Sequence, residues 1–268
     1  MNILTAMRER LDRLTVFAEL DVEPSGLPSG AAALSDASVL EVLREVTGIA
    51  NDAERLQSVV AGVAAQRSKR ENGHSGLAAT QGHASPVALV QSITGGTRAD
   101  ALRQVRVGQS LLDGAASDAA SDACVGVAPD ADAAPMTDDS PDATRAPWHA
   151  PLQSALWAGR LTTAQHDAIR GGLGEPEADG VDPASAALAW SVAAETLVDE
   201  AVAGASVEEL RARARQLRDI LDPVGAENRF QERYEKRSLR MWIDQHGQHH
   251  GHLVLDDEMA LWLRSTFA

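Results

Sequence analysis

The chain has 268 residues, of which 44% are hydrophobic and only 3% aromatic, and it carries a formal net charge of −15. This length suffices for one large or two small hydrophobic cores, and the acidic balance argues against wholesale nucleic-acid binding, because phosphates repel an acidic surface. The single Cys124 excludes an internal disulfide and a cysteine-based zinc site. The charged first twenty residues contain no signal-peptide core, and no uncharged apolar run is long enough to span a bilayer, so we expect a cytoplasmic protein that contacts no membrane.

Residues 1–37 are predicted to form an N-terminal helix followed by a loop. Apolar residues recur at helical spacing over residues 2–20, and a stretch rich in Pro, Gly and Ala then runs from Pro24 to Ala33. We therefore expect one amphipathic helix here, and no regular structure after it until the next cap.

A long helix is predicted from Ser38, which forms a capping box with Glu41, to about Arg70. Its apolar residues alternate at intervals of three and four without a break, and they are Val39, Val42, Val46, Ile49, Ala53, Leu56, Val60 and Val63. This set is called the heptad seam below. A heptad seam packs lengthwise against a partner helix, in the same chain or in a second copy, and Gly48 and Gly62 favour packing within the chain.

The rest of the region 38–112 contains two short helices joined by the turn Gly95-Gly96. Ser85 with Pro86 indicates the start of the first helix, and Thr97 caps the second. On the second helix one face is predicted to be apolar and contains Ala101, Leu102, Val105 and Leu112. The opposite face is predicted to be basic and contains Arg103, Arg106 and Ser110. Two helices with a tight turn and a basic outer face are typical of a DNA-reading element, and also of a plain helical hairpin. The candidate DNA-binding residues are Arg103, Arg106 and, more weakly, Gln104.

Residues 113–147 are predicted to be a disordered acidic insertion. No Lys or Arg occurs from Val107 to Thr144, whereas eight Asp do, and large apolar residues are almost absent. Order is expected to return over 148–237 as a helical region, in which Ser206 and Glu209 form a further capping box.

Residues 238–268 are predicted to form a β-hairpin and a terminal helix. The hairpin carries a histidine cluster, consisting of His246, His249, His250 and His252, that could hold Zn²⁺ or Ni²⁺ or could simply be a solvated turn. We favour the solvated turn, because a short turn does not easily aim several rings at one point. A hairpin followed by a helix is also the outline of an HNH nuclease core, but the final helix offers neither His nor Asn as a metal ligand.

Five segments then occur in an order that resembles a known family: VAAQRSKR, TRADALRQVRVGQSLL, ALWAGRLTTAQHDAI, VEELRARARQLRDILDP and RSLRMWIDQHGQHHGHLVLDDEMALWLRSTF. The family is the actinobacterial domain of unknown function 222, the N-terminal region of HNH endonuclease-like proteins. The resemblance covers Ser38 to the end apart from the acidic insertion, and no single motif is diagnostic. It implies a helical accessory domain of a DNA-cleaving protein linked to mobile elements, with a Cys/His HNH module and its divalent metal further downstream.

We therefore expect a mainly α-helical fold, a multi-helix bundle with a helix-turn-helix-like element and a small C-terminal β-hairpin plus helix. The family's catalytic residues have no position in this chain, so we expect no catalytic residue, metal or cofactor in it. The expected function is DNA engagement or assembly, with double-stranded DNA and a second copy as partners. The alternative is a structural dimerisation module that uses helix 38–70. Large apolar residues close to Ala268 need a partner surface, which suggests a fragment.

Overall fold

A computed structural model describes residues 2–69, 71, 75–125, 147–176 and 181–267. Within these residues the protein is mainly α-helical with one two-stranded antiparallel sheet, as predicted. In chain order the elements are α1 (Ile3–Leu14), the 3-10 helix η1 (Ala18–Leu20), α2 (Leu27–Ala33), α3 (Asp36–Gln66), α4 (Leu77–Thr80), α5 (Pro86–Thr94), α6 (Arg98–Val125), α7 (Ala150–Trp157), α8 (Thr163–Leu173), α9 (Pro183–Val202), α10 (Val207–Leu221), α11 (Pro223–Glu235), β1 (Ser238–Ile243), β2 (His249–Val254) and α12 (Asp257–Phe267). No helix in the described part of the chain combines the length and hydropathy needed to cross a bilayer.

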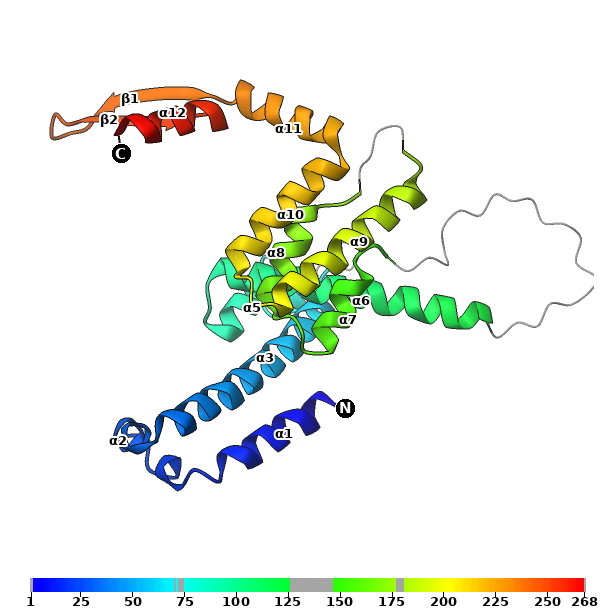
Figure 1. Cartoon of the computed structure of the whole chain (residues 1–268), viewed down its shortest axis with the longest axis vertical. Helices are drawn as coiled ribbons and strands as arrows, with labels where there is room; N and C mark the ends of the chain where they lie inside the picture. The colour runs from blue at the N-terminus through cyan, green and yellow to red at the C-terminus, as the bar shows by residue number, and fades with distance from the viewer. Residues whose placement is uncertain (1, 70, 72–74, 126–146, 177–180, 268) are drawn as a thin grey trace, which may run out of the picture.

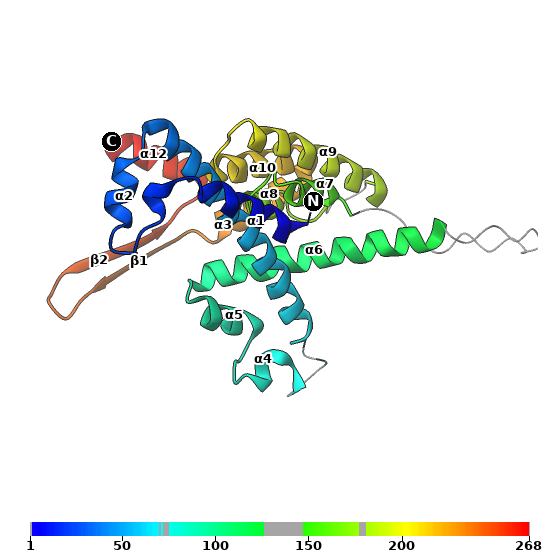
Figure 2. The same ribbon diagram turned by 90° about the horizontal axis from the view of Figure 1, so that it is seen from below.

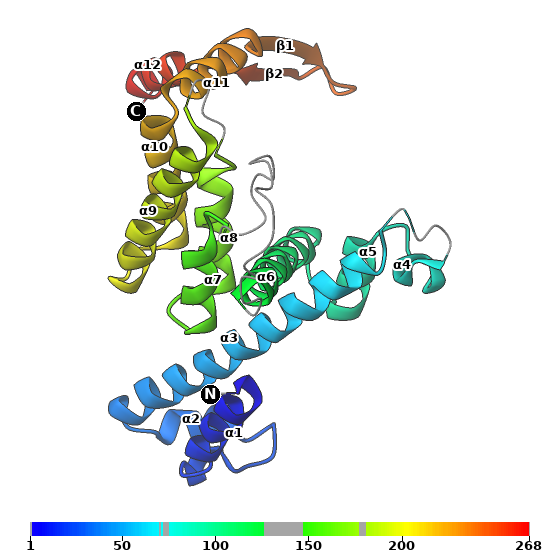
Figure 3. The same cartoon turned by 90° about the vertical axis from the view of Figure 1, so that its right-hand side faces the viewer.

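Helix α6 lies at the centre of the molecule, where α3 crosses it and α5, α7 and α8 surround it (Figures 2 and 3). The crossing with α3 is made by small residues, because Ser58, Ala61, Gly62 and Ala65 of α3 are buried there. Small side chains let two helix backbones approach closely, so the crossing is set by the spacing of these residues.

The largest hydrophobic core lies among α7, α8, α9 and α10, on the other side of α6 from α4 and α5 (Figure 3). Trp190 of α9 is fully buried in it, and its indole N–H donates to the carbonyl oxygen of Leu173 at 3.3 Å. A full capping box begins α10, since the amide of Ser206 donates to Glu209 and the amide of Glu209 donates back to the Ser206 hydroxyl. This cap was predicted and is confirmed.

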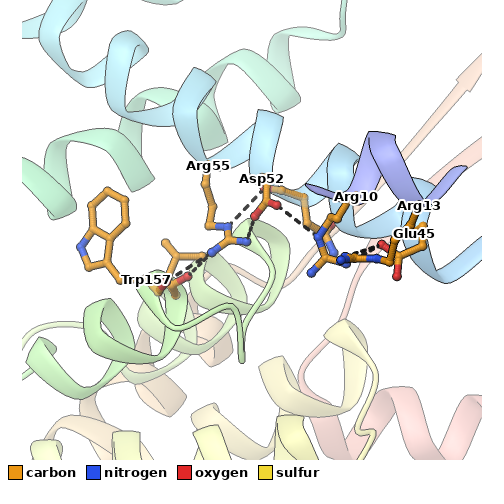
Figure 4. Close-up of polar contacts among 8 residues, drawn as sticks. Arg10, Arg13, Glu45, Asp52, Arg55 and Trp157 are labelled. Atoms are coloured by element: carbon orange, nitrogen blue, oxygen red, sulfur yellow. Dashed lines mark hydrogen bonds and ion pairs between the residues drawn. The ribbon is translucent and has the colours of Figure 1, made fainter. Parts of the chain in front are cut away.

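A row of ion pairs ties α1 to the N-terminal half of α3 (Figure 4). Arg13 Nη2 lies 2.9 Å from Glu45 Oε2, and Arg10 Nη1 lies 3.2 Å from the same oxygen. The hydrogen bond from Arg13, reinforced by Arg10, holds the pKa of the Glu45 carboxyl below its ordinary value. Arg10 Nε also lies 3.5 Å from Asp52 Oδ2, further along α3.

The same row continues from α3 to α7 through Asp52 and Arg55. Both side chains are largely buried, and they form an ion pair with each other within α3. Arg55 Nη1 also donates to the carbonyl oxygen of Leu156 at 3.0 Å, and Figure 4 shows it reaching the end of α7 beside Trp157. The side chains of Asp52 and Arg55 therefore connect α1, α3 and α7.

Helix α11, the hairpin and α12 extend away from the helical body (Figure 1). Asp222 caps α11 by accepting from the amide of Gly225 at 2.8 Å, and Asp256 caps α12 by accepting from the amide of Met259 at 2.8 Å. Strands β1 and β2 pair in a register that places Trp242 opposite His250. The predicted hairpin and the predicted terminal helix are confirmed.

Three predicted boundaries differ from the structure. Helix α3 begins earlier than predicted, because Ser35 rather than Ser38 accepts from the backbone at its start. Residues 27–33, predicted as loop, form α2, in which Pro28 lies in the first turn and three alanines follow, so that local helix preference is high. Residues 113–125, predicted as disordered, continue α6 to Val125, because extending an existing helix through alanine-rich sequence avoids the cost of nucleation. The rest of the predicted acidic insertion lies almost entirely outside the described residues.

Candidate functional site

The helix–turn–helix element around Gly95 forms as predicted. Ser85 Oγ accepts from the amide of Ala88 at 3.1 Å, and Gly95 ends α5 in the left-handed conformation at φ +66°. Thr97 Oγ1 accepts from the amide of Asp100 at 3.1 Å and donates to the Asp100 carboxylate at 2.6 Å. The hydrogen bond from Thr97 holds the pKa of Asp100 below its ordinary value, with Arg103 as a further cause.

The three DNA-binding candidates of α6 are all engaged with neighbours inside the chain. Arg103 Nη2 lies 2.7 Å from Asp100 Oδ1 and 4.0 Å from Glu54 Oε1 of α3. Arg106 Nη2 lies 2.8 Å from Asp167 Oδ2 of α8. Gln104 is buried and donates to Gln57 Oε1 of α3 at 3.2 Å.

The predicted division of α6 into an apolar and a basic face is wrong for two residues. Ser110, placed on the outer face, is fully buried, and Leu102, placed on the apolar face, is exposed. Ser110 is buried because α6 contacts helices on several sides, so its buried surface is wider than one stripe. Leu102 lies on a part of the helix that these neighbours leave open.

The four hairpin histidines do not gather on one face. His250 and His252 are two residues apart in strand β2 and share one face of the hairpin, because successive residues of a strand face opposite sides. His250 stacks on Trp242 with ring centroids 5.5 Å apart, and its Nε2 lies 3.0 Å from Asp244 Oδ2. His249 belongs to the other face, and His246 lies in the turn. Over the described residues, no group of three or more His, Cys, Asp or Glu side chains is placed to hold a metal ion.

An apolar groove of about 710 Å³ lies between α1, α3, α4 and α5. Among the described residues that line it there is no Lys, Arg, Asp or Glu, and its walls include Leu4, Met7, Leu56, Val60, Leu77 and Ile93. Several of these large side chains are exposed to solvent, including Leu56, Val60 and Ile93. A continuous apolar surface with a concave shape marks a place where another apolar element packs.

The groove contains three residues from the C-terminal half of the heptad seam. Ala53, Leu56 and Val60 line it, and Val39 and Val46 continue the exposed apolar row toward the start of α3. The prediction that a helix of this chain covers the seam is therefore wrong for these residues. Helix α6 packs instead on the small residues around Gly62, because only they allow so close a crossing.

Sequence reasoning missed the other walls of the groove. The walls contributed by α1 and α5 come from helices that were predicted, but the sequence alone does not show that their apolar side chains stay exposed. The wall contributed by α4 comes from a four-residue helix within a stretch predicted as a connector. The sequence signal for this surface was the unbroken apolar seam of α3, half of which the structure leaves exposed.

No protein-family model, no curated protein and no solved structure matches the chain. The family resemblance therefore rests on the order of the five sequence segments alone.

Proposed function

We propose that this chain is a non-catalytic helical assembly module, whose apolar groove between α1, α3, α4 and α5 docks an amphipathic helix. The observation that carries the proposal is the exposure of the heptad seam at the floor of the groove, where Val60 is 59% exposed. A helix laid along the seam would remove this apolar surface from water, which stabilises a complex by roughly 25 cal/mol per Å² before the entropy cost of association is subtracted.

The proposed occupant is α12 of a second copy of the chain. Helix α12 has an exposed apolar surface of its own, formed by Met259, Leu261 and Trp262. Figure 3 shows α12 at the upper left, well away from α4 and α5 at the right, so one copy offers both an unfilled groove and an exposed apolar helix. In two copies related by a two-fold axis, α12 of each copy fills the groove of the other, and the result is a closed dimer.

The chemistry of the groove suits this occupant. Its lining within the described residues has no formal charge, so docking an apolar helix strips water from few polar groups. Trp262 is the natural anchor, because a large aromatic side chain buried at the centre of an interface contributes much of its binding energy.

The family resemblance implies an accessory role in DNA engagement or assembly, and this proposal favours assembly. It also agrees with the alternative expectation of a dimerisation module that uses helix 38–70. DNA engagement has less support, because Gln104 is buried and both Arg103 and Arg106 already have carboxylate partners. The association with a downstream HNH module rests on the resemblance alone.

The test of the groove is the oligomeric state measured by sedimentation over a range of concentrations. The wild-type chain is expected to dimerise, and Val60→Glu is expected to give monomers, because a charge would be desolvated in the interface. Val192→Glu is the matched control, since Val192 is a 55% exposed helical valine of α9 outside the groove, and it should leave the dimer intact.

The test of the occupant uses two exposed tryptophans. Trp262→Ala should weaken the dimer by tenfold or more, as expected of an anchor worth ~2 kcal/mol. Trp157→Ala should not, although Trp157 at the end of α7 is similarly exposed, at 52% against 63% for Trp262. A wild-type monomer at every concentration, or a dimer indifferent to both Val60→Glu and Trp262→Ala, would refute the proposal.

A further inference from the structure

A second cleft, of about 570 Å³, lies between the C-terminal end of α3, the middle of α6 and the body of α8. Three cationic side chains line it, each from a different part of the fold: Lys69 follows α3, Arg106 is in α6, and Arg170 is in α8. Within the described residues no carboxylate pairs with the ammonium group of Lys69, while the guanidinium groups of Arg106 and Arg170 each have one carboxylate neighbour.

His166 of α8 also lines this cleft, and its side chain is completely buried. Neither ring nitrogen has a hydrogen-bond partner among the described residues, and the same holds for Nδ1 of the nearby buried His149. Buried polar atoms in folded proteins are almost always hydrogen-bonded, so unpaired nitrogens beside a cleft indicate that a group from outside completes the site.

We propose that this cleft binds a phosphate group carried by a small phosphorylated ligand. Arginine presents several N–H donors in a planar fork that matches phosphate oxygens, and lysine adds a mobile positive charge. The volume of the cleft falls within the range of small-molecule sites, roughly 300 to 1,000 Å³.

The two histidine rings beside the cleft carry no charge at neutral pH. Burial, followed by the positive charge of Arg170, lowers the pKa of His166 to about 3 and that of His149 to about 4. Both rings are therefore neutral at pH 7, and a neutral imidazole offers one N–H donor to an oxyanion without carrying a charge.

Three carboxylates also line the cleft, those of Asp113, Asp167 and Glu175. Asp167 holds Arg106 at 2.8 Å. Glu175 accepts from the Trp148 indole at 2.9 Å and lies 3.5 Å from Arg170. These two carboxylates orient the two guanidinium groups and balance their formal charge, so we expect a modest affinity, with a dissociation constant on the order of 1 mM.

The experiment titrates the full chain with inorganic phosphate at constant ionic strength and follows the histidine ring resonances by NMR. The resonances of His166 and His149 are expected to shift along one saturable curve, while that of His246 in the hairpin turn stays constant. Lys69→Ala and Arg106→Ala should each raise the dissociation constant roughly tenfold, the usual effect of losing a charged hydrogen bond.

Arg213→Ala is the matched control. Arg213 has 46% of its side chain exposed against 54% for Arg106, and it likewise pairs with one carboxylate, that of Glu200, but it lies outside the cleft. It should leave the titration unchanged. A linear, non-saturating shift, or a curve that Arg106→Ala does not alter, would overturn the proposal.

A second titration with a short DNA duplex identifies the source of the phosphate. If the duplex leaves the phosphate curve unchanged at matched phosphate concentration, the ligand is a small phosphorylated molecule, as proposed. If the duplex competes for the site with higher apparent affinity, the phosphate chemistry stands but the small-molecule source is refuted.

Discussion

Gly62 of α3 and Gly108 of α6 lie opposite one another where the two helices cross, and a Cβ atom on either would overlap the backbone of the other helix. Because backbone cannot give way as a flexible side chain can, Gly108→Ala must push the helices apart. We expect it to lower the free energy of unfolding by about 2 kcal/mol, a usual cost of overpacking. Denaturation in guanidinium chloride measures this difference.

Gly171→Ala is the control for that experiment. Gly171 lies inside α8, and a Cβ added there would meet no atom within 4 Å beyond the adjacent backbone of its own helix. Alanine in an open helical position restricts the unfolded chain, so the substitution should raise the free energy of unfolding by up to ~1 kcal/mol. Equal effects of the two substitutions would show that the two helix backbones do not touch at Gly108.

Asp52 is expected to be the most sensitive carboxylate of the N-terminal half. Its side chain is 4% exposed, and it contacts Arg55 and Arg10. Asp52→Ala would leave Arg55 buried without its counter-charge, and breaking a buried pair in this way costs about 3 kcal/mol or more. Thermal or chemical unfolding would detect the loss.

Glu232→Ala provides the comparison, because Glu232 forms an exposed pair with Lys236 at 3.2 Å. An exposed pair contributes at most about 1 kcal/mol, so this variant should unfold close to the wild type. If Asp52→Ala were equally mild, the row of ion pairs and hydrogen bonds from α1 to α7 would not hold these helices together.

The two buried histidines predict how stability depends on pH. The folded pKa values of His166 and His149, about 3 and about 4, lie below the unfolded value of 6.5. The unfolded chain therefore binds more protons than the folded chain below about pH 6.5, and acid favours unfolding. We expect a constant free energy of unfolding above pH 7 and a decrease approaching ~1.4 kcal/mol per pH unit for each histidine near pH 5, where the unfolded rings are protonated and the folded rings are not.

The measurement is a set of urea denaturation curves between pH 7.5 and pH 4. His166→Asn should reduce the change of the unfolding free energy with pH by the contribution of one histidine, because asparagine does not titrate. His246→Asn, in the exposed hairpin turn, should retain the full slope. A stability that does not change from pH 7 to pH 5 in the wild type would contradict the burial of neutral histidines.

The ends of the helices could be predicted from sequence because capping is local. Ser85, Thr97 and Ser206 each accept from a backbone amide three residues later, so a short window of sequence contains both partners. Ser35 was missed because Ser38, three residues on, fits the same pattern, and only the structure distinguishes the two.

Which faces are buried could not be predicted, because burial depends on residues far away in the chain. Ser110 is buried by packing against other helices, and the carbonyl oxygen of Ser110 accepts from Gln153 of α7. The seam of α3 has the spacing of a packed surface, yet the chain packs α6 on the small residues beside it. The groove and the cleft each combine residues from helices distant in sequence, so neither has a local motif.

The final prediction concerns DNA and the two arginines of α6. If the element around Gly95 docks on a duplex, Arg103 and Arg106 bind phosphates or base edges, and each must exchange a carboxylate partner for a DNA group. Arg103→Ala combined with Arg106→Ala should then weaken binding and flatten its salt dependence by about two units of slope, one for each phosphate that is no longer neutralised. Gel shifts across a salt series measure both quantities. Because Asp167 is nearly buried beside Arg106, circular dichroism must first show that the double variant keeps its helical content. Binding that is unchanged in a folded double variant would assign both arginines to the intramolecular ion pairs in which the structure places them.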